Sequence, residues 1–364
     1  MAVLQTYQSI GNREDLIPMI TIISPNDAPF TSALATKKAT GMTHEWLTDS
    51  LATPALNAVV EGADATYGTL TPRVRVANYI QNIRKTGLIS DNQEAVLKAG
   101  VKSEYSYQLE KATKEIALDS ERAFIQGTRS IGATSTAAQM GGLMYYLTSN
   151  IEEGVAGDTT AVITAATTTV ITLTAGDVAA TGAVVGSTIY ISGGVGQGQY
   201  RTITAIAGEA CTVATLDVAP VVASTVTIFD VPAALTETMV NNAFEACYNA
   251  GGSPNTVFAP TKQKRAISGF ATSVRRLTAN EQSLTQSIDI YESDFGRHAV
   301  KTNRWQPAGT LAIVETGQFA AAYLRKVVAE EMPRSGSARK FMMESAVCLE
   351  ARAENSSALI LGLA

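Results

Sequence analysis

The longest regular pattern in the chain is helical and covers residues 102–126. Its apolar side chains recur at the three- and four-residue spacing of one helix face, at Tyr105, Leu109, Ala112, Ile116, Ala123 and Phe124. Opposite charges four residues apart favour a helix on the other side, as in Glu110 with Lys114 and Lys111 with Glu115. Gly127 is suited to end this helix, and Ser90 with Gln93 matches the capping pattern of a shorter helix upstream. The pattern predicts a helix roughly 37 Å long, which is long for a domain of this size.

Alternation of polar and apolar residues upstream of this helix predicts a long hairpin. Residues 42–51 and 73–89 are expected to form its strands. The span between them, 52–72, is rich in Gly, Ala, Asp and Pro and is expected to be a loose tip. Both faces of the hairpin are too polar for a core element, so we expect the hairpin to lie on another chain.

The middle of the chain, residues 151–232, has a different pattern. Short runs rich in Val, Ile and Thr predict strands at AVITAA, TVITLT, STIYIS, YRTITAI, ACTVATL and TVTIFD. This stretch has no lysine and one arginine against seven acidic residues, a net charge of −6; the whole chain carries −5, so the remainder carries +1. The spacing of the strands favours a small all-β sandwich or barrel inserted as its own domain, with its own core and with its two ends close together.

After this insert the pattern alternates between helices and strands. An amphipathic helix is predicted at 237–250 and a second one from about Pro260. Strands are predicted at 256–259, 287–291, 298–303 and 310–315, and a closing hairpin pairs 319–331 with 339–352. The sequence therefore predicts an α+β fold with an all-β insertion.

Composition excludes several classes of protein. With 364 residues, 46% of them hydrophobic and 17% charged, the chain can bury a core and is not expected to be disordered. A net charge of −5 argues against binding nucleic acid through an overall basic field. Three scattered cysteines without a C-x-x-C pair predict neither a disulfide framework nor a zinc site. No export signal or membrane span is predicted.

Candidate catalytic residues are few. The two histidines, His44 on the hairpin and His298 on a later strand, are far apart in sequence, and each is expected to be a surface or interface polar residue. The glycine-rich run at 193–198 does not match a dinucleotide loop and is expected to be a hairpin turn. We therefore expect no catalytic residue, no cofactor and no metal, and hence no enzyme.

Two clusters of charge have ordinary explanations. The carboxylates that could be imagined as an acid/base pair are expected to be solvated; they are Glu61, Asp64, Glu330 and Glu331. The one basic cluster lacks interleaved aromatic residues, so protein contact is the favoured interpretation over phosphate binding; it comprises Lys262, Lys264, Arg265, Arg275 and Arg276.

Three segments carry a resemblance to a known family: APFTSALATKKATGMTHEWLTDSLA at 28–52, EGADATYGTLTPRVRVANYIQNIRKTGLIS at 61–90, and YSYQLEKATKEIALDSERAFIQG at 105–127. With the order of the predicted parts, they resemble the major capsid proteins of tailed bacteriophages, the Hong Kong 97 fold, in a family without a fused scaffold domain. The likeness covers residues 1–150 and 233–364, and the insert departs from it.

The resemblance implies a division of the chain into capsid-type parts. These are an N-terminal arm at 1–40, an extended hairpin loop at 41–89, the spine helix of a peripheral domain at 90–130, the start of an axial domain at 131–150, the inserted all-β domain at 151–232, the axial domain at 233–316, a peripheral-domain β-hairpin at 317–352 and a C-terminal return segment at 353–364.

The resemblance also implies a structural function. The chain would self-assemble as hexamers and pentamers into an icosahedral shell that encloses phage double-stranded DNA without sequence recognition. A separate scaffolding protein, a portal and decoration proteins would be partners, and no membrane is implied. The protein would be assembled in the cytoplasm of a host bacterium and reside in the virion.

Six residues are our candidates for contacts between subunits, because Trp and Arg commonly anchor interfaces and the hairpin is expected to reach a neighbour. They are Trp46, Glu61, Arg73, Arg75, Arg84 and Lys85. The alternative is that they only stabilise the hairpin by cross-strand pairing.

Another class of function is compatible with the Thr/Val-rich β domain. A tail, decoration or surface adhesion protein of a phage or bacterium would contain such domains, but it would consist mostly of them and would usually form trimers. Electron microscopy would distinguish the two, because closed shells or capsomers exclude an adhesin.

Overall fold

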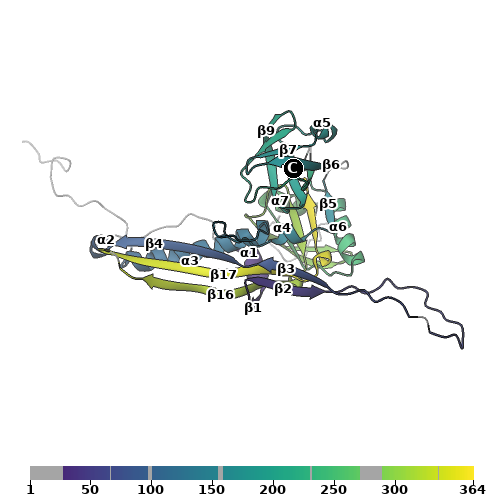
Figure 1. Ribbon diagram of the computed structural model, residues 1–364, viewed down its shortest axis with the longest axis horizontal. Coiled ribbons are helices and arrows are strands. Elements are labelled where there is room, and N and C mark those ends of the chain that lie inside the picture. Colours follow the sequence, from purple (N-terminus) through teal and green to yellow (C-terminus); the bar gives the residue numbers. More distant parts are fainter. Residues whose placement is uncertain are drawn as a thin grey trace, which may run out of the picture. The chain divides into compact units, whose positions relative to one another are not determined.

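The computed structural model describes residues 28–65, 67–96, 101–154, 159–229, 232–270, 289–334 and 336–364. The described chain forms two compact units (Figure 1). The smaller unit contains the described residues of 84–116 and 327–344, and the larger unit contains the others. No helix in these ranges is long and apolar enough to cross a membrane.

Two helices belong wholly or partly to the smaller unit. α2 (Asp91–Ala95) is capped by Ser90, whose hydroxyl accepts a hydrogen bond from the Gln93 N–H at 3.2 Å, so the predicted cap is confirmed. α3 (Glu104–Gln126) confirms the predicted long helix and continues into the larger unit.

Four strands form one sheet in the order β1-β16-β17-β4. Their bounds are β1 (Ala35–Lys38), β4 (Gln81–Ser90), β16 (Phe319–Met332) and β17 (Ala338–Ala351). β16 and β17 are the predicted closing hairpin, and they extend into both units. β1, which no pattern in the sequence predicts, pairs in parallel with β16 from Ala35↔Ala320 to Lys38↔Tyr323.

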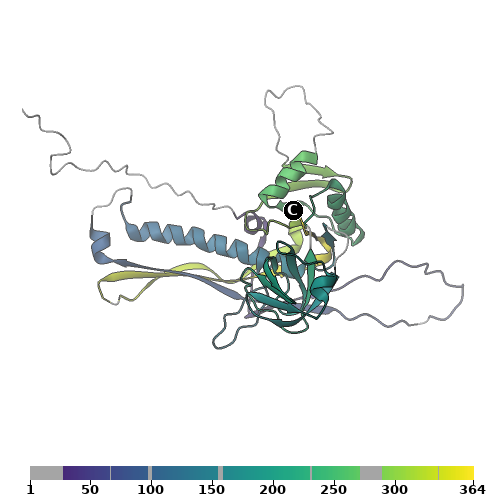
Figure 2. The same cartoon turned by 90° about the horizontal axis from the view of Figure 1, so that it is seen from above.

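Within the smaller unit, the first part of α3 lies beside the β16–β17 hairpin and packs against it (Figure 2). Tyr105 of α3 packs edge-on against Phe341 of β17, with ring centroids 5.7 Å apart. Gly87 of β4 leaves room for this ring, because a Cβ there would overlap Phe341. Ala112 and Ile116 are buried, and the predicted pairs Lys114–Glu110 and Lys111–Glu115 are formed at 2.8 and 3.8 Å. The predicted apolar face of the helix is therefore confirmed here.

A six-stranded sheet of order β13-β14-β12-β15-β18-β5 organises the larger unit. Its strands are β5 (Ile151–Glu153), β12 (Thr256–Ala259), β13 (Ile290–Ser293), β14 (Gly296–Thr302), β15 (Leu311–Val314) and β18 (Ala358–Leu361). α6 (Glu237–Asn249) packs against β18 and β5, and α7 (Thr261–Phe270) packs against β14 and β12. Their shared core includes Val240, Phe244, Ile267, Ile313 and Ile360.

Most elements after the insert lie where the sequence predicts them, with one displaced strand. The strand predicted at 287–291 is observed as β13, three residues later in its start. Residues 271–288, which include Arg275 and Arg276 of the predicted basic cluster, lie outside the described residues. Lys264 of that cluster forms an ion pair with Asp289 at 3.2 Å, within this chain.

The prediction that His298 is a surface or interface residue is wrong. Its side chain is buried in β14 and stacks on Phe244, with ring centroids 3.9 Å apart. The Pro254 carbonyl can only accept a hydrogen bond, so Nδ1 of His298 donates to it at 2.8 Å and Nε2 accepts from the Ser293 hydroxyl at 2.8 Å. Burial lowers the pKa of His298. This histidine is therefore a satisfied core residue.

The inserted segment forms a closed barrel of order β10-β7-β6-β11-β8-β9. Its strands are β6 (Thr159–Ala166), β7 (Val170–Leu173), β8 (Thr188–Gly193), β9 (Tyr200–Ala207), β10 (Ala210–Val213) and β11 (Thr225–Phe229), with the short helix α5 (Asp177–Ala180) after β7. Its separate core includes Ile163, Ile171, Ile189, Ile203, Cys211 and Val226. The predicted run of strands is confirmed, and it closes as a barrel rather than a sandwich.

The start of the insert differs from the predicted boundary at 151. Residues Ile151–Glu153 form β5, which pairs in parallel with β18 in the six-stranded sheet, from Leu359↔Ile151 to Leu361↔Glu153. The barrel itself begins at β6. The local sequence Ile-Glu-Glu does not reveal that this strand pairs with the distant C-terminal region.

The extended hairpin has a paired base and a long connection. β2 (Thr43–Thr48) and β3 (Val74–Tyr79) pair antiparallel from Thr43↔Tyr79 to Thr48↔Val74. The single strand predicted at 73–89 is two strands, because β3 ends at Tyr79 and β4 begins at Gln81. The remaining short elements are α1 (Pro29–Ala33), α4 (Leu143–Tyr146), η3 (Thr316–Gln318) and η4 (Glu354–Ser356).

Candidate assembly interface

The connection between β2 and β3 exposes a run of large apolar side chains. Figure 2 shows this segment as an open loop beyond the two strands. Leu51 is 99% exposed and Tyr67 is 97% exposed. The other exposed apolar side chains of this loop are Leu56, Val59, Val60 and Leu70. Such a concentration of apolar surface, without a core of its own, is typical of a segment that another protein surface covers.

The base of the hairpin contains three of the six candidate contact residues. Arg73 pairs with Asp49 at 3.6 Å, and Arg75 pairs with Glu45 at 3.4 Å. Both pairs join β2 and β3 or their immediate ends, as the cross-strand alternative requires. Each arginine remains about 70% exposed, however, so the guanidinium groups are accessible to a second chain as well.

Trp46 lies at the same base but is partly covered by its own chain. Its ring centroid lies 5.8 Å from that of Tyr146 and 5.9 Å from that of His44. The indole Nε1 is buried and has no hydrogen-bond partner among the described residues. Trp46 therefore contributes to the packing of the hairpin on the subunit, and its role in contact between subunits stays a prediction.

The other three candidates are elsewhere. Glu61 lies in the exposed loop. Arg84 and Lys85 lie on β4 in the smaller unit, where Arg84 pairs with Glu344 at 3.3 Å and Lys85 lies 3.9 Å from Glu115. Three of the six residues thus share the hairpin base, Glu61 lies in the loop, and Arg84 and Lys85 lie on β4, each beside a glutamate.

Sequence reasoning missed Glu350, a buried carboxylate near the hairpin base. Its Oε1 accepts hydrogen bonds from Lys37 Nζ at 2.9 Å and Arg352 Nε at 2.8 Å, and its Oε2 accepts one from His44 Nε2 at 3.0 Å. Burial favours a raised pKa, but the hydrogen bonds from Arg352, His44 and Lys37 outweigh burial and lower the pKa of Glu350 to about 2. His44 is thus a half-buried partner of a carboxylate.

Glu121 of α3 is a second buried carboxylate that sequence reasoning missed. Its Oε1 accepts from the Phe30 N–H at 2.9 Å and from Asn303 Nδ2 at 2.6 Å, and its Oε2 accepts from the N–H and hydroxyl of Thr31, both at 2.6 Å. One signal in the sequence could have found it: Glu121 lies three residues before Phe124, on the buried face of the predicted helix.

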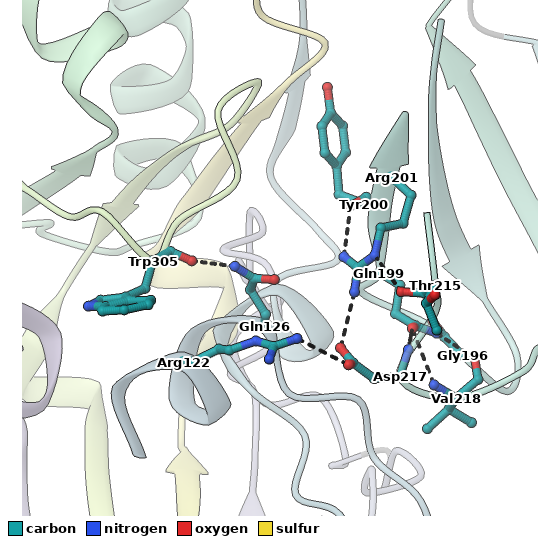
Figure 3. Close-up of polar contacts among 10 residues, drawn as sticks. All are labelled: Arg122, Gln126, Gly196, Gln199, Tyr200, Arg201, Thr215, Asp217, Val218 and Trp305. Atoms are coloured by element: carbon teal, nitrogen blue, oxygen red, sulfur yellow. Dashed lines mark hydrogen bonds and ion pairs between the residues drawn. The ribbon is translucent and has the colours of Figure 1, made fainter. Parts of the chain in front are cut away.

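The barrel is fixed to the rest of the larger unit by polar contacts that Figure 3 shows. Asp217, between the barrel strands, pairs with Arg122 of α3 at 3.2 Å and with Arg201 of β9 at 3.1 Å. Gln199 holds the loop that carries Asp217, because its Oε1 accepts from the Asp217 N–H at 2.7 Å and its Nε2 donates to the Val218 carbonyl at 2.8 Å. One carboxylate therefore joins the barrel to the long helix.

The glycine-rich turn between β8 and β9, predicted as a hairpin turn, also contacts the host. Gly198 has φ +87°, and a Cβ there would lie 2.8 Å from the Tyr145 nitrogen. Beside it, Gln197 Nε2 donates to the Tyr145 carbonyl at 3.2 Å, and the Tyr190 hydroxyl donates to the Met144 carbonyl at 3.2 Å. The barrel has its own core, but it also packs on α4. Removing the barrel would therefore expose α4 to solvent.

Gly198→Ala is expected to destabilise the protein, whereas Gly208→Ala is a matched control. Both glycines have positive φ, so each alanine costs about 1–2 kcal/mol. Only position 198 adds a collision, since nothing lies within 4 Å of a Cβ at Gly208. We expect thermal unfolding to show a melting temperature several degrees lower for Gly198→Ala than for Gly208→Ala. Equal melting temperatures would mean that the barrel does not pack on α4.

Comparisons with known proteins agree with this architecture. The sequence model of the SU10 major capsid protein family matches residues 3–364. The major capsid protein of Escherichia phage Phieco32 is 34% identical over 123 residues, which is 34% of this chain and 35% of that protein. The match thus spans about a third of that relative's length.

Solved capsid structures share the fold at low sequence identity. The capsid of Cyanophage A-1(L) superposes with a TM-score of 0.55 at 10% identity, covering 99% of this chain and 98% of that one. The capsid of a native GTA particle gives a TM-score of 0.54 at 10% identity, covering 99% and 97%. The predicted α+β fold of the Hong Kong 97 type is therefore confirmed, and the chain belongs to the SU10 major capsid protein family.

Proposed function

We propose that copies of this chain self-associate as hexamers and pentamers and close into an icosahedral shell around phage double-stranded DNA. The observation that carries this proposal is the exposed apolar loop between β2 and β3. Stable interfaces bury about 800 Å² on each partner, and a long loop without internal core supplies such area at little cost to the folded subunit. Family membership supports the same function.

Within this proposal, the loop and the hairpin base contact a neighbouring subunit. Glu61 lies in the loop, and Arg73 and Arg75 keep most of their side chains exposed beside it. Arginine can add a contact to a second carboxylate while keeping its cross-strand pair, because the guanidinium group has five donors. Trp46 would act by holding the base of the hairpin in place. Arg84 and Lys85 would contribute from β4.

The remaining partners follow from the same proposal. The DNA would be held without sequence recognition, since a chain of net charge −5 has no overall basic field and small counterions can neutralise packaged DNA. A separate scaffolding protein, a portal and decoration proteins would complete the particle. Assembly would take place in the cytoplasm of the host bacterium, and the final location would be the virion. The boundaries inferred from the resemblance, from the arm at 1–40 to the return segment at 353–364, belong to this proposal, except that the insert begins after β5 (Ile151–Glu153).

Sedimentation velocity of the purified chain tests self-association. We expect species at the mass of pentamers, hexamers or larger particles. A chain that stays monomeric over the accessible concentrations would contradict the proposal, and a stable trimer would favour the alternative of a tail, decoration or adhesion protein.

We also propose that the protein is no enzyme and needs no metal. The described residues contain no group of three or more His, Cys, Asp or Glu side chains placed to hold an ion. The three cysteines are buried, and burial raises the pKa of the Cys247 and Cys348 thiols to about 12, which disfavours the reactive thiolate.

Chelation should therefore change neither folding nor assembly. We expect the same melting temperature and the same sedimentation profile with and without a strong chelator of divalent ions. Loss of assembled species on chelation, restored by one added divalent ion, would show that a metal is required.

A further inference from the structure

Residues 28–44, which run from α1 to the first residues of β2, are held by two buried carboxylates from other parts of the larger unit. Glu121 binds its first part and Glu350 binds its last part. We call residues 28–44 the clamped segment. It leads into β2, the first strand of the extended hairpin, so its position sets the point from which the hairpin leaves the subunit.

At the first attachment point, Glu121 is 0% exposed and accepts four hydrogen bonds. None of these four donors carries a charge. A buried carboxylate is costly unless hydrogen bonds satisfy it, so loss of these donors would destabilise the buried position of Glu121. Three of the four donors belong to Phe30 and Thr31 of the clamped segment, and the fourth belongs to Asn303.

Packing supports this attachment. Phe30 is fully buried, and its ring centroid lies 5.3 Å from that of Phe258 and 6.5 Å from that of Phe319. α1 has only five residues and is too short to be stable by itself. Its order therefore depends on Glu121 and on the Phe30 site.

The middle of the clamped segment, β1, is an edge strand of the four-stranded sheet. All four residues of β1 are exposed, and the strand pairs with β16 along one edge. At the second attachment point, Lys37 and His44 both bind Glu350, which is 4% exposed. The two glutamates thus hold a segment that has little burial of its own between Leu34 and Ala39.

We propose that Glu121 and Glu350 are positioning residues for assembly: together they clamp residues 28–44 and so fix where the extended hairpin leaves the subunit. The inference rests on the proposed shell-forming function. Each glutamate acts through the segment it holds and need not touch a neighbouring subunit. Both side-chain oxygens of each glutamate accept hydrogen bonds from the segment, so each glutamate holds the segment at two residues.

The test uses two lysines that the clamped segment already contains. Trypsin can cut after Lys37 and Lys38 when β1 leaves the sheet, whereas Arg73 is an exposed reference site outside the segment. The full-length chain and the variants Glu121→Gln and Glu350→Gln are digested briefly, and the ratio of cleavage at 37–38 to cleavage at 73 is measured by mass spectrometry. Glu110→Gln is the matched control, since Glu110 is an exposed partner of Lys114 on the same helix as Glu121.

In both test variants the glutamine NH₂ group replaces one carboxylate oxygen. That oxygen accepts hydrogen bonds in the parent chain, whereas the NH₂ group can only donate and therefore faces another donor. We expect the cleavage ratio to rise about tenfold or more, and the yield of assembled species to fall, while the control matches the parent chain. Thr31→Val, which loses only one donor to Glu121, should raise the ratio less and in the same direction. A general loss of stability would also raise cleavage at a site that the rest of the fold protects, such as Arg201 of the barrel, so cleavage after Arg201 should stay at the parent level in both variants.

Several results would overturn the clamp. An unchanged ratio in Glu121→Gln or Glu350→Gln contradicts it, and so does a Glu121→Gln chain that fails to fold while Thr31→Val leaves the ratio unchanged. A raised ratio with normal assembly shows that the clamp exists but does not position the hairpin for assembly. If the parent chain itself does not assemble, the proposed function fails independently of the cleavage result.

Discussion

Deleting residues 52–72 is expected to leave a folded subunit that forms none of the assembled species of the intact chain. The deleted loop contains exposed apolar side chains such as Leu56, Tyr67 and Leu70, and none of its described residues is a buried core residue. Its loss therefore removes surface for a neighbour and leaves the two cores intact. Shortening a surface loop changes the entropy of loop closure only logarithmically.

Circular dichroism and sedimentation velocity check this result together. We expect the same folded signal and a melting temperature within a few degrees of the parent subunit, with complete loss of pentamers, hexamers and larger species. Replacing Leu56, Tyr67 and Leu70 by serine at constant length is the matched control for loop length, and it should weaken assembly in the same direction. Normal assembly of the deletion variant would show that this loop is not the contact surface.

The second large effect concerns the long helix: Ile116→Asp is expected to prevent folding altogether. Ile116 is 1% exposed and belongs to the apolar face of α3. Burying an unpaired carboxylate there costs several kcal/mol, a large part of the roughly 5–15 kcal/mol that stabilises a typical domain. We expect aggregated product without a protease-resistant core.

Ala117→Asp is the matched control for this substitution. It places the same carboxylate one residue later, on an exposed position of α3. We expect it to fold and to melt within a few degrees of the parent chain. If Ile116→Asp were folded and resistant to protease, the side of α3 that we assign to the core would be the wrong one.

Local patterns were sufficient to predict much of the fold. The three- and four-residue spacing predicted α3 to within two residues of its start, and the Ser90–Gln93 pattern predicted the cap of α2. Six runs of Val, Ile and Thr predicted the six barrel strands. Each of these elements is formed by residues that are close together in sequence. Periodicity and capping patterns were therefore enough to predict them.

Contacts between distant segments could not be predicted in this way. β5 pairs with β18 from the far end of the chain, whereas the change in composition along the chain placed residues 151–153 in the insert. His298 is polar, yet hydrogen bonds to Ser293 and Pro254 satisfy it in the core. The same holds for Glu121 and Glu350. A glutamate is expected on the surface, but these two are buried because donors from distant parts of the sequence hydrogen-bond to them.

The candidate site was predicted only in part, and mainly through the resemblance. Composition and polarity indicated that the hairpin needs another surface, but they could not distinguish contact between chains from pairing within one chain. In the structure, Arg73 and Arg75 pair across the hairpin and stay exposed. Arg73 and Arg75 can therefore pair across the hairpin and also contact a second chain, and assembly measurements on variants of these residues test the second role.

Negative-stain electron microscopy of the purified full-length chain tests the central claim most directly. Shell formation predicts closed icosahedral particles, or the ring-shaped hexamers and pentamers from which such particles are built, with both kinds of ring lost when residues 52–72 are removed. A field of single subunits or of uniform trimers from the intact chain would contradict the account.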